Sequence, residues 1–163
     1  MNLILTGERQ IGKSTALCRF LSGYAGSITG FRTVFNQRNI PENRHLLLYP
    51  LPDGDTEAAV VWQNGRPEVN LSVFNRMVPP LLAQSADLLV MDELGKFEVN
   101  AVQMRRAVES AFNAERNVLA VVRLDAPSWM GALMQRRDVT VLTVTAENRD
   151  RIPAMLAKLL PQV

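Results

Sequence analysis

Short apolar runs alternate along the chain with segments whose apolar residues recur at helical spacing. Runs of the first kind predict buried strands, which are expected at residues 1–6, 27–33, 87–93, 117–122 and 139–143. Segments of the second kind predict helices, which are expected at residues 14–21, 70–82, 102–112 and 152–160. Alternating strands and helices predict an α/β fold, in which a mostly parallel sheet carries helices on both faces.

A hairpin is expected beside this parallel sheet. Strand-like runs at 45–49 and 58–62 flank residues 50–55, whose prolines and Asp-Gly pair are typical of a long turn. Residues 64–67 predict another turn. The polar stretch 34–43 predicts an exposed loop. Asn70 or Ser72 is expected to cap the helix that follows, and Pro79-Pro80 is expected to bend it.

Composition indicates an ordinary globular protein. With 163 residues, 47% hydrophobic and 21% charged, the chain is expected to form one domain over residues 1–163 with a sizeable core. The 18 Lys and Arg residues against 16 Asp and Glu give a formal net charge of +2, which carries no strong signal for nucleic acid. The chain opens on its first strand and contains no long apolar span, so a cytoplasmic protein without membrane contact is expected.

Metal sites built from cysteine or histidine are excluded by counting. Cys18 is the single cysteine, so neither an intrachain disulfide nor a Cys-based zinc site can form, and it is expected to be a small buried residue. His45 is the single histidine and is expected to be a loop or hairpin residue.

Residues 7–14, Gly-Glu-Arg-Gln-Ile-Gly-Lys-Ser, satisfy the phosphate-loop pattern G-x-x-x-x-G-K-[ST] between a strand and a helix. The glycines let the loop turn its N–H groups inward, and the helix N-terminus adds its positive dipole end. Lys13 is expected to reach the β- and γ-phosphates, and the Ser14 hydroxyl to join the shell of Mg²⁺. The loop therefore predicts a site for a nucleoside triphosphate such as ATP or GTP. Its expected nucleotide-binding residues are Gly7, Arg9, Gln10, Ile11, Gly12, Lys13 and Ser14.

Two carboxylates end the buried run at 87–93 and form a second landmark. Open α/β sheets place ligand-facing groups at the C-terminal ends of their strands, so Asp92 is expected beside the phosphate loop as a Mg²⁺ ligand through water. Glu93 is expected to orient or deprotonate the water that attacks the γ-phosphate. This pair favours hydrolysis, with Lys13 and Glu93 as catalytic residues.

Phosphoryl transfer also needs positive charge on the transition state, commonly from an arginine. The candidates are Arg9, Arg123, Arg136, Arg137 and Arg149. Arg123 follows the strand at 117–122, should lie on the same sheet edge as Asp92, and is the preferred catalytic arginine. Lys96 is expected either to contact phosphate or to cap its loop.

Residues 92–98, Asp-Glu-Leu-Gly-Lys-Phe-Glu, resemble the D-E-[IL]-G-K-[MF]-E signature of the THEP1-type nucleoside triphosphatases, a small P-loop family. Gly30-Phe31-x-Thr33 resembles the family's G-F-x-T element. Residues 147–150, Glu-Asn-Arg-Asp, resemble its late E-N-R-D motif, and Val69-Asn70 before a Phe-containing helix resembles its approach to the acidic strand. The match covers most of the chain.

This resemblance implies a RecA-like P-loop fold and slow, Mg²⁺-dependent hydrolysis of several nucleoside triphosphates to the diphosphate and phosphate. It implies that Asp92 binds the metal and that Glu93 acts on the attacking water. The residues that it implies bind the nucleotide are Gly7, Gly12, Lys13, Ser14 and Thr15. Gln10 stands where the family usually has glycine, at a backbone position that favours φ > 0. Residues 34–37 replace acidic and basic residues that usually follow G-F-x-T.

Two alternatives to a hydrolase stay open. A kinase for a nucleotide or small molecule would use residues 124–138, which contain Arg136-Arg137, as an arginine-bearing lid. A nucleotide-dependent switch would bind a partner through the loop at 34–43 in one state only. A GTPase switch is disfavoured because no N/T-K-x-D motif occurs. The sequence carries no signal for the preferred base, a protein partner or an oligomeric state.

Overall fold

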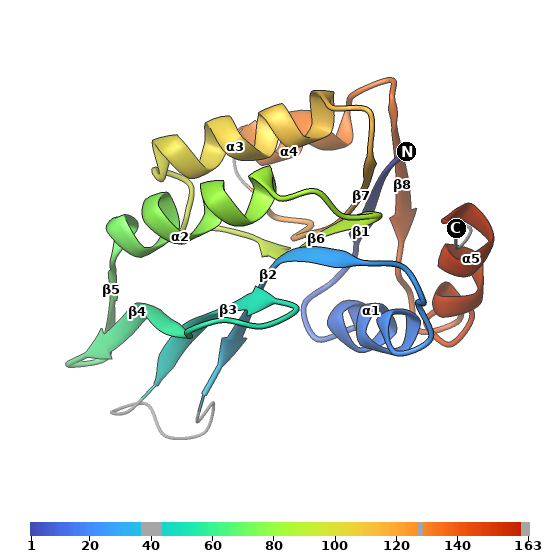
Figure 1. The fold of residues 1–163 in the computed structure, drawn as a ribbon. Helices are drawn as coiled ribbons and strands as arrows, with labels where there is room; N and C mark the ends of the chain where they lie inside the picture. Colours follow the sequence, from blue (N-terminus) through green and yellow to red (C-terminus); the bar gives the residue numbers. More distant parts are fainter. Residues whose placement is uncertain (37–43, 127–128, 161–163) are drawn as a thin grey trace.

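Five parallel strands form the centre of the protein in a computed structural model that describes residues 1–36, 44–126 and 129–160 (Figure 1). These strands are β1 (Asn2–Thr6), β2 (Ile28–Phe35), β6 (Leu88–Leu94), β7 (Asn117–Val122) and β8 (Val139–Thr143). They pair in the order β2-β6-β7-β1-β8, so β7 separates β1 from β6. The C-terminal ends of all five strands therefore share one edge of the sheet.

Helices cover both faces of this sheet, as expected. The helices are α1 (Lys13–Leu21), α2 (Leu71–Ala83), α3 (Val102–Asn113), α4 (Trp129–Met134) and α5 (Ile152–Leu159). Figure 1 shows α1 and α5 on one face and α2, α3 and α4 on the other. The arrangement is the three-layer α/β fold that alternating strands and helices predict. No helix among the residues that the structure describes has the length and apolar character needed to cross a membrane.

Antiparallel strands extend the sheet beyond β2. They are β3 (His45–Leu51), β4 (Glu57–Gln63) and β5 (Arg66–Val69), in the order β2-β3-β4-β5. The hairpin expected beside the parallel sheet is β3–β4, and it continues the same hydrogen-bonded sheet. His45 lies in it, as expected.

The strand β5 was not predicted. Residues 66 and 67, expected to be part of a turn, pair in β5 with Gln63 and Trp62. The turn is confined to Asn64 and Gly65, both at positive φ (50° and 74°), which is the two-residue Asn-Gly hairpin connection. Because all four residues of β5 are exposed, the strand shows no apolar alternation that a sequence pattern could reveal.

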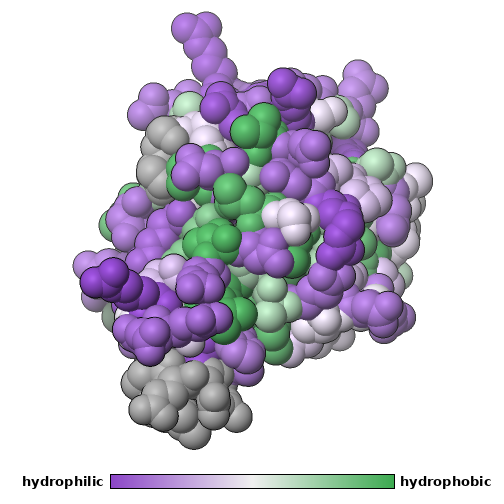
Figure 2. All heavy atoms as spheres, turned by 90° about the vertical axis from the view of Figure 1, so that its left-hand side faces the viewer, coloured by the Kyte–Doolittle hydropathy of each residue, from purple (hydrophilic) through white to green (hydrophobic). Residues whose placement is uncertain are grey.

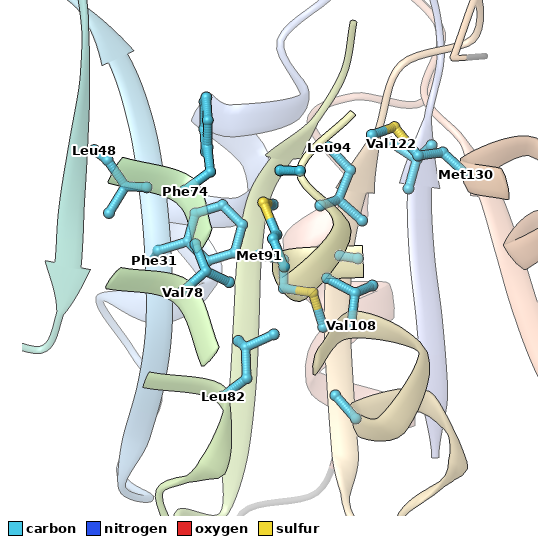
Figure 3. Close-up of a cluster of buried hydrophobic side chains, with 14 of the residues drawn as sticks. Phe31, Leu48, Phe74, Val78, Leu82, Met91, Leu94, Val108, Val122 and Met130 are labelled. Carbon is cyan, nitrogen blue, oxygen red and sulfur yellow. The ribbon is translucent and has the colours of Figure 1, made fainter. Parts of the chain in front are cut away.

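Two hydrophobic clusters form the core, one on each face of the sheet. Figure 3 shows part of the larger one, where Phe74 and Val78 of α2 point toward Phe31 of β2, and the Met91 side chain extends from β6 into the same cluster. Phe31, Phe74 and Met91 are completely buried. The smaller cluster packs α1 and α5 against the opposite face.

Most element boundaries agree with the expected ones to within two residues. The helix α4 is an exception, because its six residues are too few for a periodic pattern. The helix α2 continues through Pro79 and Pro80 to Ala83. Asn70 is its N-cap, but the Asn70 side chain accepts a hydrogen bond from the Ser72 hydroxyl (2.7 Å) and none from the helix backbone. Cys18 is half-buried on α1, less buried than expected.

One edge of the sheet lies open at β5. Figure 2 shows the molecule from this side, where apolar side chains gather at the centre of the face within a rim of polar ones. Arg66, Pro67 and Glu68 give the edge strand charges and a proline, features that discourage pairing with another chain.

We predict that Phe74→Ala destabilises the fold strongly, because it removes a completely buried ring from the larger cluster. The free energy of unfolding should fall by about 3–5 kcal/mol. The matched control is Val102→Ala at an α3 residue that is 55% exposed, which should change stability by less than about 1 kcal/mol. Urea denaturation followed by circular dichroism measures both, and equal losses would contradict this account of the core.

Candidate active site

The phosphate loop connects β1 to α1 and takes a shape that few sequences allow. Gly7, Gln10 and Gly12 have positive φ angles of 143°, 61° and 109°. A Cβ on Gly7 would lie 2.5 Å from the carbonyl oxygen of Val144, so the loop can approach the end of β8 only with glycine here. The positive φ expected at Gln10 is observed, and this chain adopts it with a side chain present.

Lys13 begins α1 and turns back over the loop. Its ammonium donates hydrogen bonds to the carbonyl oxygens of Gly7 (3.0 Å) and Glu8 (2.8 Å). The side chain is 7% exposed, and this burial lowers the pKa of Lys13, while the nearby Glu93 carboxylate acts to raise it. The ammonium is therefore a desolvated group held against the carbonyl oxygens of the loop.

The acidic end of β6 contacts the phosphate loop through Ser14. The Ser14 hydroxyl donates a hydrogen bond of 2.7 Å to one carboxylate oxygen of Asp92, and Nε of Arg32 donates one of 3.0 Å to the other. Arg32 and Asp92 face each other in the register of β2 and β6. Asp92 is 1% exposed, so its charge is buried but paired.

This pair of oxygen ligands suits Mg²⁺. A serine hydroxyl and one carboxylate are hard oxygen ligands, and Mg²⁺ commonly binds one or two such groups together with water and substrate phosphate. Among the described residues, no three His, Cys, Asp or Glu side chains cluster closely enough to hold a metal ion by themselves. The donor set at Ser14 and Asp92 therefore fits a metal that arrives with its nucleotide.

Glu93 follows Asp92 in β6 and lines the pocket with the phosphate loop. Its backbone N–H donates to the hydroxyl of Thr33 (3.3 Å), which in turn donates to the Asp92 carbonyl oxygen (3.4 Å). Burial raises the pKa of Glu93, and the Lys13 ammonium acts in the opposite direction. The carboxylate is thus half-buried on the pocket wall beside Lys13.

Arg123 follows β7 and lies on the same sheet edge, as expected. Its guanidinium donates two hydrogen bonds of 2.9 Å to the carboxylate of Asp125. This pairing raises the pKa of Arg123 and lowers that of Asp125. Both residues line the pocket with Lys13 and Glu93.

Glu98 lies in the turn that follows β6, next to the pocket residues Glu93 and Arg123. No role was predicted for it from the sequence. Its carboxylate accepts a hydrogen bond from the backbone N–H of Gly95, and the residue is 3% exposed. Burial raises the pKa of Glu98 to about 7. A Cβ on Gly95 would lie 3.0 Å from Cδ of Arg123, so the turn after β6 packs directly on that arginine.

The pocket at this edge has a volume of about 870 Å³. It brings together most of the site residues expected from sequence, namely Gly7, Arg9, Gln10, Gly12, Lys13, Ser14, Thr15, Glu93 and Arg123. Ile11 instead packs against the smaller hydrophobic cluster, and Asp92 is buried behind Ser14 and Arg32. Lys96 lines the pocket with its ammonium 5.0 Å from the centre of the Phe97 ring.

The other candidate arginines lie in different places, and Arg9 lines the pocket itself. Arg136 is bonded to Asp138 (2.9 and 2.7 Å), which precedes β8 and contacts Asn2 at the start of β1. It therefore lies at the N-terminal edge of the strands, opposite the phosphate loop. Arg149 lies against the loop, since a Cβ on Gly12 would be 3.8 Å from its Cδ.

Sequence reasoning left Arg32, Thr33 and Asp125 without a role. Thr33 belongs to the Gly30-Phe31-x-Thr33 element, whose likeness to the family drew attention to this strand. The contact of Arg32 with Asp92 depends on the register between β2 and β6, which that element alone does not specify.

Comparison with known proteins identifies the family. A family model described as NTPase matches residues 2–157. The Nucleoside-triphosphatase THEP1 of Natranaerobius thermophilus is 30% identical over 167 residues, which cover 96% of this chain and 94% of that protein. The chain belongs to the THEP1-type nucleoside triphosphatase family. The resemblance drawn from residues 92–98 is thereby confirmed.

Other members of the THEP1-type family agree. The Nucleoside-triphosphatase THEP1 of Methanothermobacter thermautotrophicus is 26% identical over 176 residues, covering 98% of this chain and 96% of that protein. The crystal structure of THEP1 from the hyperthermophile Aquifex aeolicus matches with a TM-score of 0.84 at 20% identity, over 99% of this chain and 100% of that one. The expected P-loop fold is confirmed.

We predict that Glu98 makes stability fall with rising pH. Its pKa is about 7 in the folded protein against 4.5 ordinarily, so between these values the folded state holds a proton that the unfolded state has lost. Stability from this group is full below pH 4.5 and is lost as pH rises to about 7, by an amount of the order of 3 kcal/mol. Glu98→Gln should remove this loss.

The measurement is the free energy of unfolding in urea, taken from pH 5 to pH 8 for both proteins. Glu115→Gln at an exposed glutamate is the matched control and should follow the wild type. Parallel curves for the wild type and Glu98→Gln would show that Glu98 is not held protonated in the fold.

Proposed function

We propose that this chain hydrolyses nucleoside triphosphates to the diphosphate and phosphate, in a reaction that depends on Mg²⁺ and accepts several bases. The activity belongs to its THEP1 relatives by name. The observation that carries the proposal is the convergence of Lys13, Ser14 and Glu93 on one pocket at the C-terminal ends of β1 and β6. The proposed location is the cytoplasm.

In this proposal the phosphate loop binds the triphosphate through its inward N–H groups. Lys13 would exchange the carbonyl oxygens of Gly7 and Glu8 for β- and γ-phosphate oxygens, as the lysine of this motif does. The helix α1 begins at Lys13, so the positive end of its dipole also faces the bound phosphates in this proposal. These groups account for binding without any contact to the base, which supports a broad base preference.

Ser14 and Asp92 are the residues that would hold Mg²⁺, Asp92 through water. The bound ion would supply positive charge to the β- and γ-phosphate oxygens. Arg32 has a positioning part here, because its hydrogen bond to Asp92 fixes the carboxylate and balances its charge. The Thr33 hydroxyl donates a second hydrogen bond to the end of β6, at the carbonyl oxygen of Asp92.

Glu93 is the proposed general base. A carboxylate whose pKa is raised by burial accepts a proton from water more readily than an ordinary one, and the Lys13 ammonium limits that rise. The water would lie between Glu93 and the γ-phosphate, and its proton would pass to the Glu93 carboxylate as the oxygen attacks phosphorus. The bond from the γ-phosphorus to the oxygen that bridges the β- and γ-phosphates would break, and the diphosphate would leave with that oxygen.

Arg123 is the proposed arginine for the transition state. It lines the same pocket as Glu93, and its two bonds to Asp125 hold it on the pocket wall. Contact with the γ-phosphate would require a phosphate oxygen to compete with Asp125 for the guanidinium.

The kinase alternative is weaker. Its expected lid depended on Arg136-Arg137, and Arg136 is bound to Asp138 at the opposite edge of the sheet. The switch alternative depended on the loop at 34–43, of which residues 37–43 lie outside the described residues. Hydrolysis is therefore the proposal, and a protein partner is not part of it.

We predict that Lys13→Ala abolishes nucleoside triphosphate binding and turnover. The variant removes the cation that lies beside the loop and contacts Gly7 and Glu8. Calorimetric titration with ATP and Mg²⁺ measures binding, and Lys158→Ala, on the exposed part of α5, is the matched control. Wild-type affinity in Lys13→Ala would count against the phosphate-loop site.

We predict that Glu93→Gln keeps nucleotide binding and lowers kcat by roughly 10² or more, because the amide cannot accept the proton from water. Phosphate release from ATP, GTP, CTP and UTP with Mg²⁺ measures the rate, with the diphosphate quantified. The wild-type rate should rise with pH as Glu93 loses its proton. EDTA should abolish it.

Glu109→Gln, at a half-buried glutamate of α3 that pairs with Arg105 outside the pocket, is the control for this substitution. An unchanged kcat in Glu93→Gln would move the role of base to another residue. Tight binding with no phosphate release by the wild type would overturn the hydrolase proposal itself.

A further inference from the structure

Three aromatic side chains line the same pocket as the phosphate loop. Phe35 ends β2, Trp62 lies on β4 and Phe97 follows β6. The centre of the Trp62 ring is 5.5 Å from the ring centres of both Phe35 and Phe97, in edge-to-face geometry. We call these three residues the aromatic wall.

Arg44 lies across this wall. Its guanidinium carbon is 4.3 Å from the centre of the Phe35 ring and 4.7 Å from the centre of the Trp62 ring. The backbone carbonyl of Arg44 accepts a hydrogen bond from the backbone N–H of Trp62 (3.0 Å), which holds the residue against β4. The arginine is thus placed by the fold and stacked by its neighbours.

One N–H of the Arg44 guanidinium lacks a polar partner. Its Nε is buried and, within the described part of the chain, has no hydrogen-bond partner. By contrast, Arg32 and Arg123 in the same region are bonded to Asp92 and Asp125. A buried guanidinium N–H without an acceptor is costly, so Arg44 is suited to receive an anionic group from a ligand.

The wall stands on the γ-phosphate side of the pocket. Phosphate loops hold the β- and γ-phosphates at their lysine, and the γ-phosphate faces the carboxylate of the neighbouring strand. Here that carboxylate is Glu93, and β2 and β4 lie beyond β6 as seen from β1. The nucleoside of a triphosphate bound in the loop would extend away from Glu93. The wall therefore faces something other than that base.

We propose that the aromatic wall and Arg44 bind a second small ligand, a nucleoside monophosphate, beyond the γ-phosphate position. Its base would pack against the aromatic wall beside the Arg44 guanidinium, since every base offers a flat π-face. Its phosphate would bond to the part of the Arg44 guanidinium that lines the pocket, with the Lys96 ammonium as a second cation at the same rim. A pocket of about 870 Å³ is large enough for such a ligand next to the phosphate loop.

This site requires neither hydrolysis nor an occupied phosphate loop. The experiment is a titration of the protein with AMP, GMP, CMP and UMP, followed by tryptophan fluorescence and by calorimetry. Trp62 is the expected reporter, because the other tryptophan, Trp129, is 6% exposed and donates its indole N–H to the carbonyl of Val99. The quenching should saturate, and Trp62→Phe should abolish it while calorimetry still detects binding.

Binding should be separate from the phosphate loop. It should persist in Lys13→Ala and in wild-type protein saturated with ADP and Mg²⁺. Arg44→Gln should weaken it by about tenfold or more, because a charged hydrogen bond is lost. Arg44→Lys should recover part of the affinity by keeping the charge. Arg137→Gln, at an exposed arginine outside the pocket, is the matched control and should bind as the wild type does.

Four results would overturn the proposal. They are the absence of saturable binding, its loss in Lys13→Ala or with ADP and Mg²⁺ present, equal affinity in Arg44→Gln, and binding of a short single-stranded oligonucleotide but of no monophosphate. The second result would mean that the aromatic wall binds the nucleotide that is hydrolysed. The fourth would mean that it binds single-stranded nucleic acid. A protein that binds monophosphates but releases no phosphate from triphosphates would keep this proposal and lose the one for hydrolysis.

Discussion

The site depends on one hydrogen bond, from the Ser14 hydroxyl to the carboxylate of Asp92, between residues 78 positions apart in the chain. It can form because β1 and β6 are parallel and end at the same edge, with β7 between them. The bond joins the start of α1 to the end of β6. It thereby sets the phosphate loop opposite Glu93, and the rest of the pocket is arranged around this pair.

Charge in this pocket is balanced locally. Lys13 bonds to loop carbonyl oxygens, Arg32 to Asp92, and Arg123 to Asp125. Arg32 and Arg123 are therefore each held by a carboxylate and Lys13 by carbonyl oxygens, and a phosphate group can compete for these cations. Burial also lowers the pKa of Lys13 and raises the pKa of Glu93, so it favours the neutral form of each. The proximity of the two groups favours their charged forms instead. Arg44 differs, since aromatic faces are its neighbours.

Local patterns predicted the parts of the fold that local physics determines. The phosphate loop needs glycine spacing and a following helix, and β6 needs an apolar run before its acids, so both could be located from sequence. The strand β5 and the helix α4 were missed because neither shows an apolar period. The roles of Arg32 and Glu98 could not be predicted, because one depends on strand register and the other on burial beneath a turn. The assignment of chemical roles to Lys13, Glu93 and Arg123 stays a prediction.

The end of β2 shows how one strand can serve two halves of a pocket. Arg32 and Thr33 contact Asp92 and so belong to the half that contains the phosphate loop. Phe35, two residues further along β2, packs against Trp62. Because alternate residues of a strand share one face, Thr33 and Phe35 extend from the same face of β2, the first toward Asp92 and the second toward Trp62.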